Sequence, residues 1–198
     1  MSTLLAIALT LGLTPSRADA NAARTPQKSA EKAAANWIEA VREDRWAAAL
    51  SMMTPESEDQ FLVRSASFLL SPKAGEGADE VLDRHADGAA LSKRIEAMME
   101  AGGRPSEEQF KAAAALIRDR PGLAKAIVGR MRDQGVESWI SDLNDDAVET
   151  TLTVAEGPRT VMGRTFDAVA TLRVEGEDMS GREQIGLRKT DDGWLIDY

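Results

Sequence analysis

The chain contains no cysteine among its 198 residues, and this absence excludes several kinds of chemistry. Disulfide cross-links, thiolate nucleophiles and cysteine metal ligands all need a side chain that this sequence lacks. Histidine is almost as scarce, because His85 is the single example. Strong transition-metal sites usually gather several His or Cys ligands, so we expect no metal site and no bound cofactor.

Basic residues are too few and too scattered for a nucleic-acid surface. The chain has 24 Lys and Arg against 33 Asp and Glu, which gives a net charge of −9, and it contains no basic run. Phosphate backbones and anionic lipid surfaces both attract clustered positive charge. We therefore expect neither nucleic acid nor an anionic membrane surface among the partners.

The N-terminal residues resemble a secretory signal peptide. Residues 4–13 form an apolar run of 10 residues, which is too short to span a bilayer. Ala18-Asp19-Ala20 then offers a small-x-small cleavage site that would leave Asn21 as the first mature residue. No Lys or Arg precedes the apolar run, and the alternatives are a buried N-terminal helix or a poorly ordered tail.

The pattern favours a signal peptide over residues 1–20, followed by a single α+β domain over residues 21–198. The mature protein would then be soluble, exported to a periplasm or secreted, and without an integral membrane segment.

Apolar residues recur at helical spacing through most of the chain up to residue 143. Thr25-Pro26 has the composition of an N-cap and a first helical residue, and the stripe around Trp37 would follow it. Thr54-Pro55 repeats this start signal, and Ser106-x-x-Gln109 is a capping box. Further helices are expected after the loop at residues 71–77, while residues 136–143 fit a short helix or a strand. Several methionines occupy positions expected to lie in the core: Met98, Met99 and Met131.

From Val148 onward the hydrophobic period changes from 3.6 to 2, which predicts strands. Leu152 and Val154 alternate with threonines in a first strand, and Gly157-Pro158 is expected to end it. A second strand, a turn and two more strands follow, with Asp192-Gly193 supplying the positive φ of the last hairpin. The sequence thus predicts N-terminal helices packed on a curved antiparallel meander of about four strands.

Two segments resemble the nuclear transport factor 2-like superfamily, whose domains have a cone-shaped α+β fold. Residues 36–50 are similar to that superfamily's opening helix, corner and second helix. The meander from about residue 145 onward, above all residues 187–197 with Asp192-Gly193-Trp194, is similar to its sheet. Residues 72–144 are longer and more helical than the family pattern, and we interpret them as a helical elaboration.

The resemblance implies a fold rather than an activity, because the superfamily includes ketosteroid isomerases, dehydratases, polyketide cyclases and exported domains without known catalysis. A ketosteroid isomerase site needs an Asp base with a Tyr and a protonated Asp as oxyanion donors. The only Tyr is Tyr198, at the end of the sequence, so no catalytic residue is carried over.

Polar candidates for a site have simpler explanations. His85 lies in an acid-rich stretch with Asp83 and Asp87, and these three would share a face only on a strand, so a solvated acidic face is favoured over a metal or proton-transfer site. Residues 142–146 imitate the start of a calcium loop but lack its Gly and its final Glu, which favours an ordinary turn. Carboxylate chemistry would have to use Glu149, Asp167 or Asp197.

The four tryptophans are candidates for lining a ligand site. Trp37 and Trp194 fit core positions better, because large aromatic side chains are usually buried. Trp46 and Trp139 are the candidate ligand-binding residues.

The leading hypothesis is a non-enzymatic exported domain that binds a small ligand or a protein partner in a cavity between its helices and its sheet. The alternatives are a carboxylate-based isomerase, dehydratase or cyclase in the same cavity, and a structural domain that self-assembles as a homodimer through the sheet.

Overall fold

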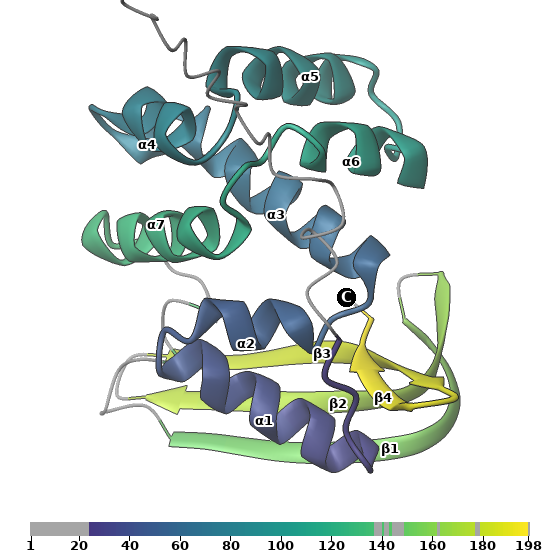
Figure 1. Ribbon diagram of the computed structural model, residues 1–198. Helices are drawn as coiled ribbons and strands as arrows, with labels where there is room; N and C mark the ends of the chain where they lie inside the picture. Colours follow the sequence, from purple (N-terminus) through teal and green to yellow (C-terminus); the bar gives the residue numbers. More distant parts are fainter. Residues whose placement is uncertain are drawn as a thin grey trace, which may run out of the picture.

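The structure is α+β, with helices in the first part of the chain and an antiparallel sheet in the last part (Figure 1). It is a computed structural model that describes residues 24–136, 140, 143, 149–161, 163–176 and 179–197. Seven α-helices and four strands lie in these residues. The predicted fold class is therefore confirmed.

Most helices begin at a capping side chain, as expected for exposed backbone N–H groups at helix starts. Thr54 caps the third helix, and Ser106 and Gln109 form the predicted capping box of the sixth. The bounds are α1 (Ala30–Arg42), α2 (Trp46–Ser51), α3 (Pro55–Leu69), the 3₁₀ turn η1 (Pro72–Ala74), α4 (Ala78–His85), α5 (Gly88–Glu100), α6 (Glu107–Ala114) and α7 (Arg120–Asp133).

The first helix begins later than predicted, because Ser29 rather than Thr25 is its N-cap. Gln27 instead exchanges two backbone hydrogen bonds with Trp194, at 3.0 and 2.8 Å. The prediction from Thr25-Pro26 is therefore wrong. Pairing with a distant strand uses the backbone groups that a helix would need, and it outweighs the local capping signal.

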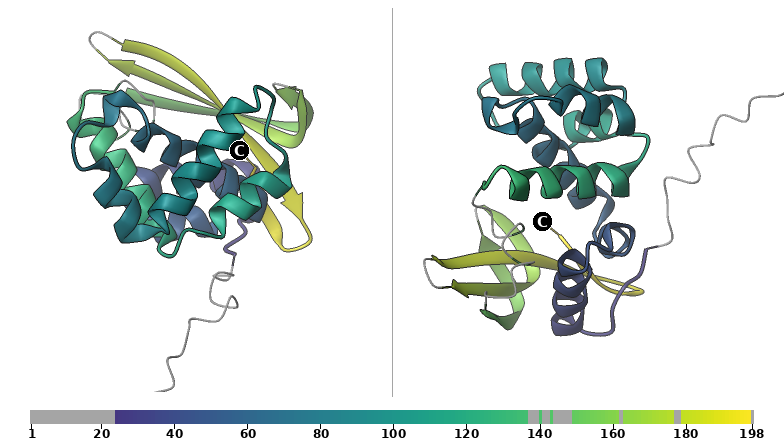
Figure 2. Two further views of the ribbon diagram at one scale, coloured as in Figure 1. Left: turned by 90° about the horizontal axis from the view of Figure 1, so that it is seen from above. Right: turned by 90° about the vertical axis from the view of Figure 1, so that its left-hand side faces the viewer.

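The helices form two tiers, one that includes α1 and α2 with the sheet and one that lies beside it (Figures 1 and 2). Helix α1 lies across one face of the sheet and contacts all four strands. Helix α3 leads away from the sheet, and α4, α6 and α7 pack around it, with α5 on α4 and α6. Helix α7 also contacts α2, so it joins the upper helices to the tier that holds the sheet.

The sheet is a simple meander in the order β1-β2-β3-β4, with every neighbouring pair antiparallel. Leu152 and Val154 of β1 pack against the core, whereas Thr151 and Thr153 are exposed, so the predicted alternation is confirmed. The strands are β1 (Glu149–Val161), β2 (Arg164–Gly176), β3 (Met179–Thr190) and β4 (Gly193–Ile196).

Gly157-Pro158 does not end the first strand, contrary to the prediction. The register between β1 and β2 shifts between Glu156 and Arg159, and Gly157 has φ of 98°. This is a β-bulge, and the strand continues beyond it to Val161. Pro158 is tolerated because β1 is an edge strand, where a missing N–H need not break a ladder.

The outer edge of β4 is covered by two segments from the other end of the chain. Gln27 pairs with Trp194 on this edge, and Met53 forms a parallel bridge with Ile196. Gly193 begins β4 with φ of 140°, as the hairpin prediction required, and a Cβ there would lie 2.6 Å from the carbonyl oxygen of Gln27. The turn residue therefore also permits the close approach of the N-terminal segment.

The core confirms two of the tryptophan assignments and corrects one methionine. Trp37 and Trp194 are buried, and so is Met98, while Met131 is partly buried against the core. Met99 is 66% exposed, so its expected core position is wrong. It lies roughly 80° around the helix from Leu91, because each residue advances the direction by about 100°.

Two glycines provide a matched test of packing. A Cβ at Gly186 would lie 2.3 Å from the ring of Phe166 and 2.5 Å from the carbonyl oxygen of Asp197, whereas a Cβ at Gly129, inside α7, meets nothing within 4 Å. We expect Gly186→Ala to lower the free energy of unfolding by about 2 kcal/mol through overpacking. Gly129→Ala should raise it by about 0.5–1 kcal/mol through helix propensity. Urea unfolding of both variants checks this, and equal effects would contradict it.

Candidate functional site

The first turn of α3 is the point where buried polar side chains from four parts of the chain meet. Thr54 and Pro55 start the helix here. Ser57 contacts Asp197, whereas Glu58 and Asp59 both contact Arg120. Ser57 and Glu58 are buried. Two groups of charges are built on this turn.

The first group surrounds the carboxylate of Asp197, which is 3% exposed and directly follows β4. Arg188 donates to Oδ2 from Nε at 3.0 Å and from Nη2 at 2.6 Å. Arg164 donates to Oδ1 at 3.0 Å, and the hydroxyl groups of Ser57 and Thr54 donate to the same oxygen at 2.8 and 3.2 Å. Both carboxylate oxygens are thus occupied by donors.

These contacts determine the charge state of Asp197. Burial alone would raise the pKa of its carboxyl, but hydrogen bonds from Arg188 and Ser57 and the positive charges of Arg164 and Arg188 hold that pKa below its ordinary value. A carboxylate with a lowered pKa and no unshared oxygen is a poor general base. The group is therefore a structural ion cluster.

The second group centres on Glu58. Arg24 contacts Glu58 Oε2 at 2.6 Å and Arg120 contacts Oε1 at 2.9 Å, while Arg120 also contacts Asp59 at 2.8 Å. Arg24 donates further to the carbonyl oxygens of Leu50 and Met53. This group joins the N-terminal segment, α3 and α7.

Asp59 differs from Asp197 in the direction of its pKa shift. Burial raises the pKa of Asp59, although the hydrogen bond and the charge of Arg120 oppose this effect. A raised carboxyl pKa can indicate an acid catalyst when it lies in a cleft. Here the same carboxylate is in contact with Arg120, so an ion pair explains its position.

His85 ends α4 and connects it to the start of α7. Its Nδ1 lies 2.8 Å from Oδ2 of Asp119, which is the N-cap of α7. The N–H of Gly122 and the hydrogen bond from His85 lower the pKa of the Asp119 carboxyl. Asp83 and Asp87 do not contact His85 in this arrangement, since Asp87 caps α5 and the carbonyl of Asp83 accepts from Arg118.

The sequence reading missed Asp119 because it is 34 residues from His85. Within the residues that the structure describes, no group of three or more His, Cys, Asp and Glu side chains could hold a metal ion.

Trp46, one of the two candidate ligand-binding residues, begins α2 and is 2% exposed. Its ring stacks on Phe61 with centroids 5.9 Å apart, and its Nε1 donates to Asp44 at 3.3 Å. These contacts are those of a core residue, and the ligand-binding role of Trp46 stays a prediction. Trp139, the other candidate, lies outside the described residues, as do residues 142 and 144–146 of the calcium-like motif.

Asp167 and Glu149 are the other two carboxylates that the sequence offers for acid–base chemistry. Asp167 accepts the backbone N–H of Lys189 at 2.9 Å, which is a contact within the sheet. The side chain of Glu149 lies outside the described part of the chain.

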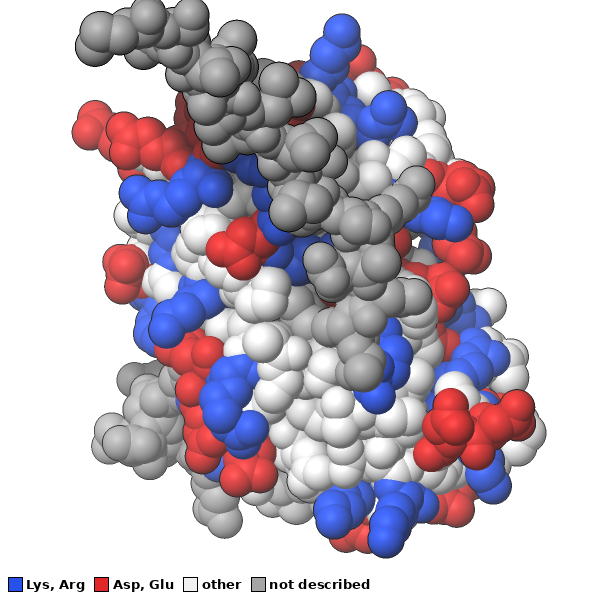
Figure 3. Space-filling view, in the orientation of Figure 1, with Lys and Arg blue, Asp and Glu red and all other residues white. Residues whose placement is uncertain are grey.

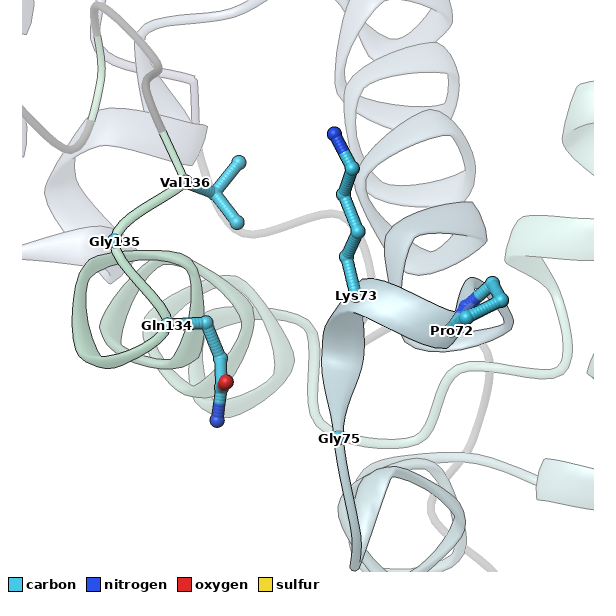
Figure 4. A pocket seen from close by; sticks show the side chains of 6 residues that line it. All are labelled: Pro72, Lys73, Gly75, Gln134, Gly135 and Val136. Carbon is cyan, nitrogen blue, oxygen red and sulfur yellow. The ribbon is translucent and has the colours of Figure 1, made fainter.

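A hollow of about 610 Å³ lies between η1 and the end of α7 (Figure 4). The side chains of Lys73 and Val136 face each other across it, and Gln134 lies on the side of Gly75. Arg130 of α7 holds the end of η1 and the loop after it, because it donates to the carbonyl oxygens of Ala74 and Glu76. The hollow offers a cation, an apolar side chain and exposed backbone, and no sequence pattern had marked it.

The surface around these sites carries charges of both signs. Figure 3 shows Lys and Arg interspersed with Asp and Glu over the described residues of one face. No described helix is long and apolar enough to cross a membrane.

Comparison with known proteins yields no relative: no family model, no curated protein and no solved structure matches the chain. The resemblance to the nuclear transport factor 2-like superfamily therefore stays a prediction.

Asp197→Asn tests the first ion cluster. The variant keeps the size of the side chain but removes the negative charge that Arg164 and Arg188 contact. These guanidinium side chains are 25% and 45% exposed, so we expect a loss of about 2 kcal/mol at pH 7, less than for a fully buried pair.

The difference in the free energy of unfolding between the wild type and Asp197→Asn should depend on pH. The folded pKa of Asp197 is lowered, so its stabilisation is present above the unfolded value of about 3.9 and is lost as the pH falls through the folded value. Urea unfolding between pH 7 and pH 3 should show the gap closing. Asp192→Asn, in the exposed turn, is the control, and an unchanged gap at low pH would contradict the assignment.

Proposed function

We propose that the protein is an exported, non-enzymatic domain that binds a small ligand. The hollow between η1 and α7 carries this proposal, because its volume of about 610 Å³ is within the range typical of small-molecule sites. Lys73 supplies a positive charge and Val136 an apolar contact. These groups suit a small anion with an apolar body.

The ligand is placed in this hollow rather than between the helices and the sheet. The side chains on the helix-facing side of the sheet that we expected to line a cavity are buried in the core: Ala168, Ala170, Leu172, Ile185, Leu187 and Ile196. The ligand-binding role of Trp139 stays a prediction from the sequence.

A carboxylate enzyme is the weaker alternative. Of the carboxylates named for such chemistry, Asp197 is bound by two arginines and Asp167 by a backbone N–H. General acid–base catalysis needs a carboxyl within reach of a substrate, and neither group lines the hollow.

Reversing the charge at Lys73 tests the ligand site. We expect Lys73→Glu to weaken binding of the anionic aromatic probe 8-anilinonaphthalene-1-sulfonate by roughly fivefold to tenfold, because an attraction becomes a repulsion. Fluorescence titration measures the dissociation constant. Lys125→Glu, at an exposed position of α7 outside the hollow, makes the same change of net charge and should have little effect. Equal affinities of the two variants would count against the site.

Export is tested by the N-terminus of the protein after expression with its own leader. Cleavage after Ala20 should leave Asn21 as the first residue, because small side chains at positions 18 and 20 suit signal peptidase. Mass spectrometry of the protein from the periplasm or medium measures this. An intact Met1 in the exported protein, or no exported protein, would contradict the proposal.

Self-association through the sheet is a second candidate. It is favoured by the outer edge of β1, which pairs with nothing in the described part of the chain.

A further inference from the structure

The two edges of the sheet differ in how they are protected. The outer edge of β4 is covered by Gln27 and Met53. The outer edge of β1, which is 13 residues long, has no backbone partner among the described residues, and it forms one border of the sheet in Figure 1. Unpaired N–H and C=O groups on such an edge are a template for another strand.

The unprotected part of β1 is restricted to its first half. The second half has the usual devices against edge pairing, namely the bulge at Gly157, a proline at Pro158 and a charged side chain at Arg159. Residues 150–155, Thr-Thr-Leu-Thr-Val-Ala, contain no charge, no proline and no bulge. This half of the edge therefore lacks the features that normally prevent association.

We propose that residues 150–156 pair antiparallel with the same residues of a second copy, with Thr153 on the two-fold axis. This inference rests on the proposed self-association through the sheet and specifies its surface. The two sheets would join into one continuous sheet of eight strands, four from each copy. Two-fold dimers are the commonest homo-oligomers.

The register follows from the two faces of the strand. Directly opposed residues must point to the same side of the sheet, so even-numbered residues pair with even and odd with odd. A two-fold axis at Thr153 sets Leu152 opposite Val154 on the core side, where both are only partly buried. On the exposed side, Thr153 lies opposite Thr153 of the second copy. No charged residue of one copy lies opposite a residue of like charge in the other.

A two-fold axis at Leu152 would pair fewer of residues 150–156 within β1 than the axis at Thr153. Glu156 would then pair with a residue before Glu149, outside β1, whereas the axis at Thr153 pairs the whole segment 150–156 with itself. The bulge that follows Glu156 ends the pairing, because the strand bends there.

The absence of charge in residues 150–155 favours a second copy over a partner selected by charge. Each copy has a net charge of −9, so the two copies repel one another away from the shared edge. Salt screens this repulsion, and we therefore expect the dimer to become tighter as ionic strength rises.

A single cysteine provides the first test, because the chain has none of its own. Directly opposed residues of antiparallel strands have Cα atoms about 4.5–5.5 Å apart, which lies within the range that a disulfide can span. Thr153→Cys should form a disulfide-linked dimer under mild oxidation. Gln184→Cys is the control, because Gln184 is exposed and lies two strands away from Thr153 in the same row, through Thr171.

Sedimentation velocity provides the second test. Thr153→Lys places two like charges at the axis and should raise the dimer dissociation constant about fivefold or more. Gln184→Lys adds the same charge two strands away from β1 and should leave the dissociation constant close to that of the wild type. Circular dichroism of both variants verifies folding, and the cysteine experiment decides the matter if Thr153→Lys does not fold.

The outcomes separate this inference from the broader proposal. A wild type that stays monomeric at every concentration overturns both the self-association and its surface. A wild-type dimer that tolerates Thr153→Lys, with no cross-link through Thr153→Cys, overturns the β1 edge while self-association stands. A monomer whose β1 pairs with a foreign peptide overturns the choice of a second copy.

Discussion

The rest of the structure depends on the buried carboxylate of Asp197. Its donors come from β3, from the tip of the β1–β2 hairpin and from the start of α3, so one side chain fixes the relative positions of three elements. Charge neutralisation makes this burial tolerable, because an unpaired carboxylate would cost several kcal/mol in the interior. The neighbouring Glu58 then ties the same helical turn to α7 and to the N-terminal segment. The helical tier and the sheet are positioned through this turn.

Local sequence patterns predicted the elements more reliably than their ends. The alternation around Leu152, the caps at Thr54 and Ser106, and the turn at Gly193 depend on interactions within a few residues. Thr25-Pro26 failed because Gln27 pairs with Trp194, and Gly157-Pro158 failed because an edge strand tolerates a bulge. Both errors come from contacts that no local pattern contains.

The candidate sites were harder to predict, for the same physical reason. Trp46 is a residue type that often contacts ligands, but here its ring stacks on Phe61. That contact depends on how α3 packs, which the local sequence does not indicate. His85 was expected on a solvated acidic face, yet its side chain contacts Asp119, the cap of a helix that begins 35 residues later. Lys73 lies in a glycine-rich loop without a motif, and only the position of α7 beside it forms a hollow.

The contacts of the N-terminal segment with β4 affect the order in which the chain can fold. The bridge from Gln27 to Trp194 and the bond from Ser57 to Asp197 join the early part of the chain to its last described residues. Such contacts have high sequence separation and form slowly, because a long loop must close first. Helices α3 to α7 pack on one another through contacts between segments that are close in the sequence. Helix α1, in contrast, can pack on the complete sheet only after β4 has been synthesised. During synthesis, therefore, the lower tier is completed last.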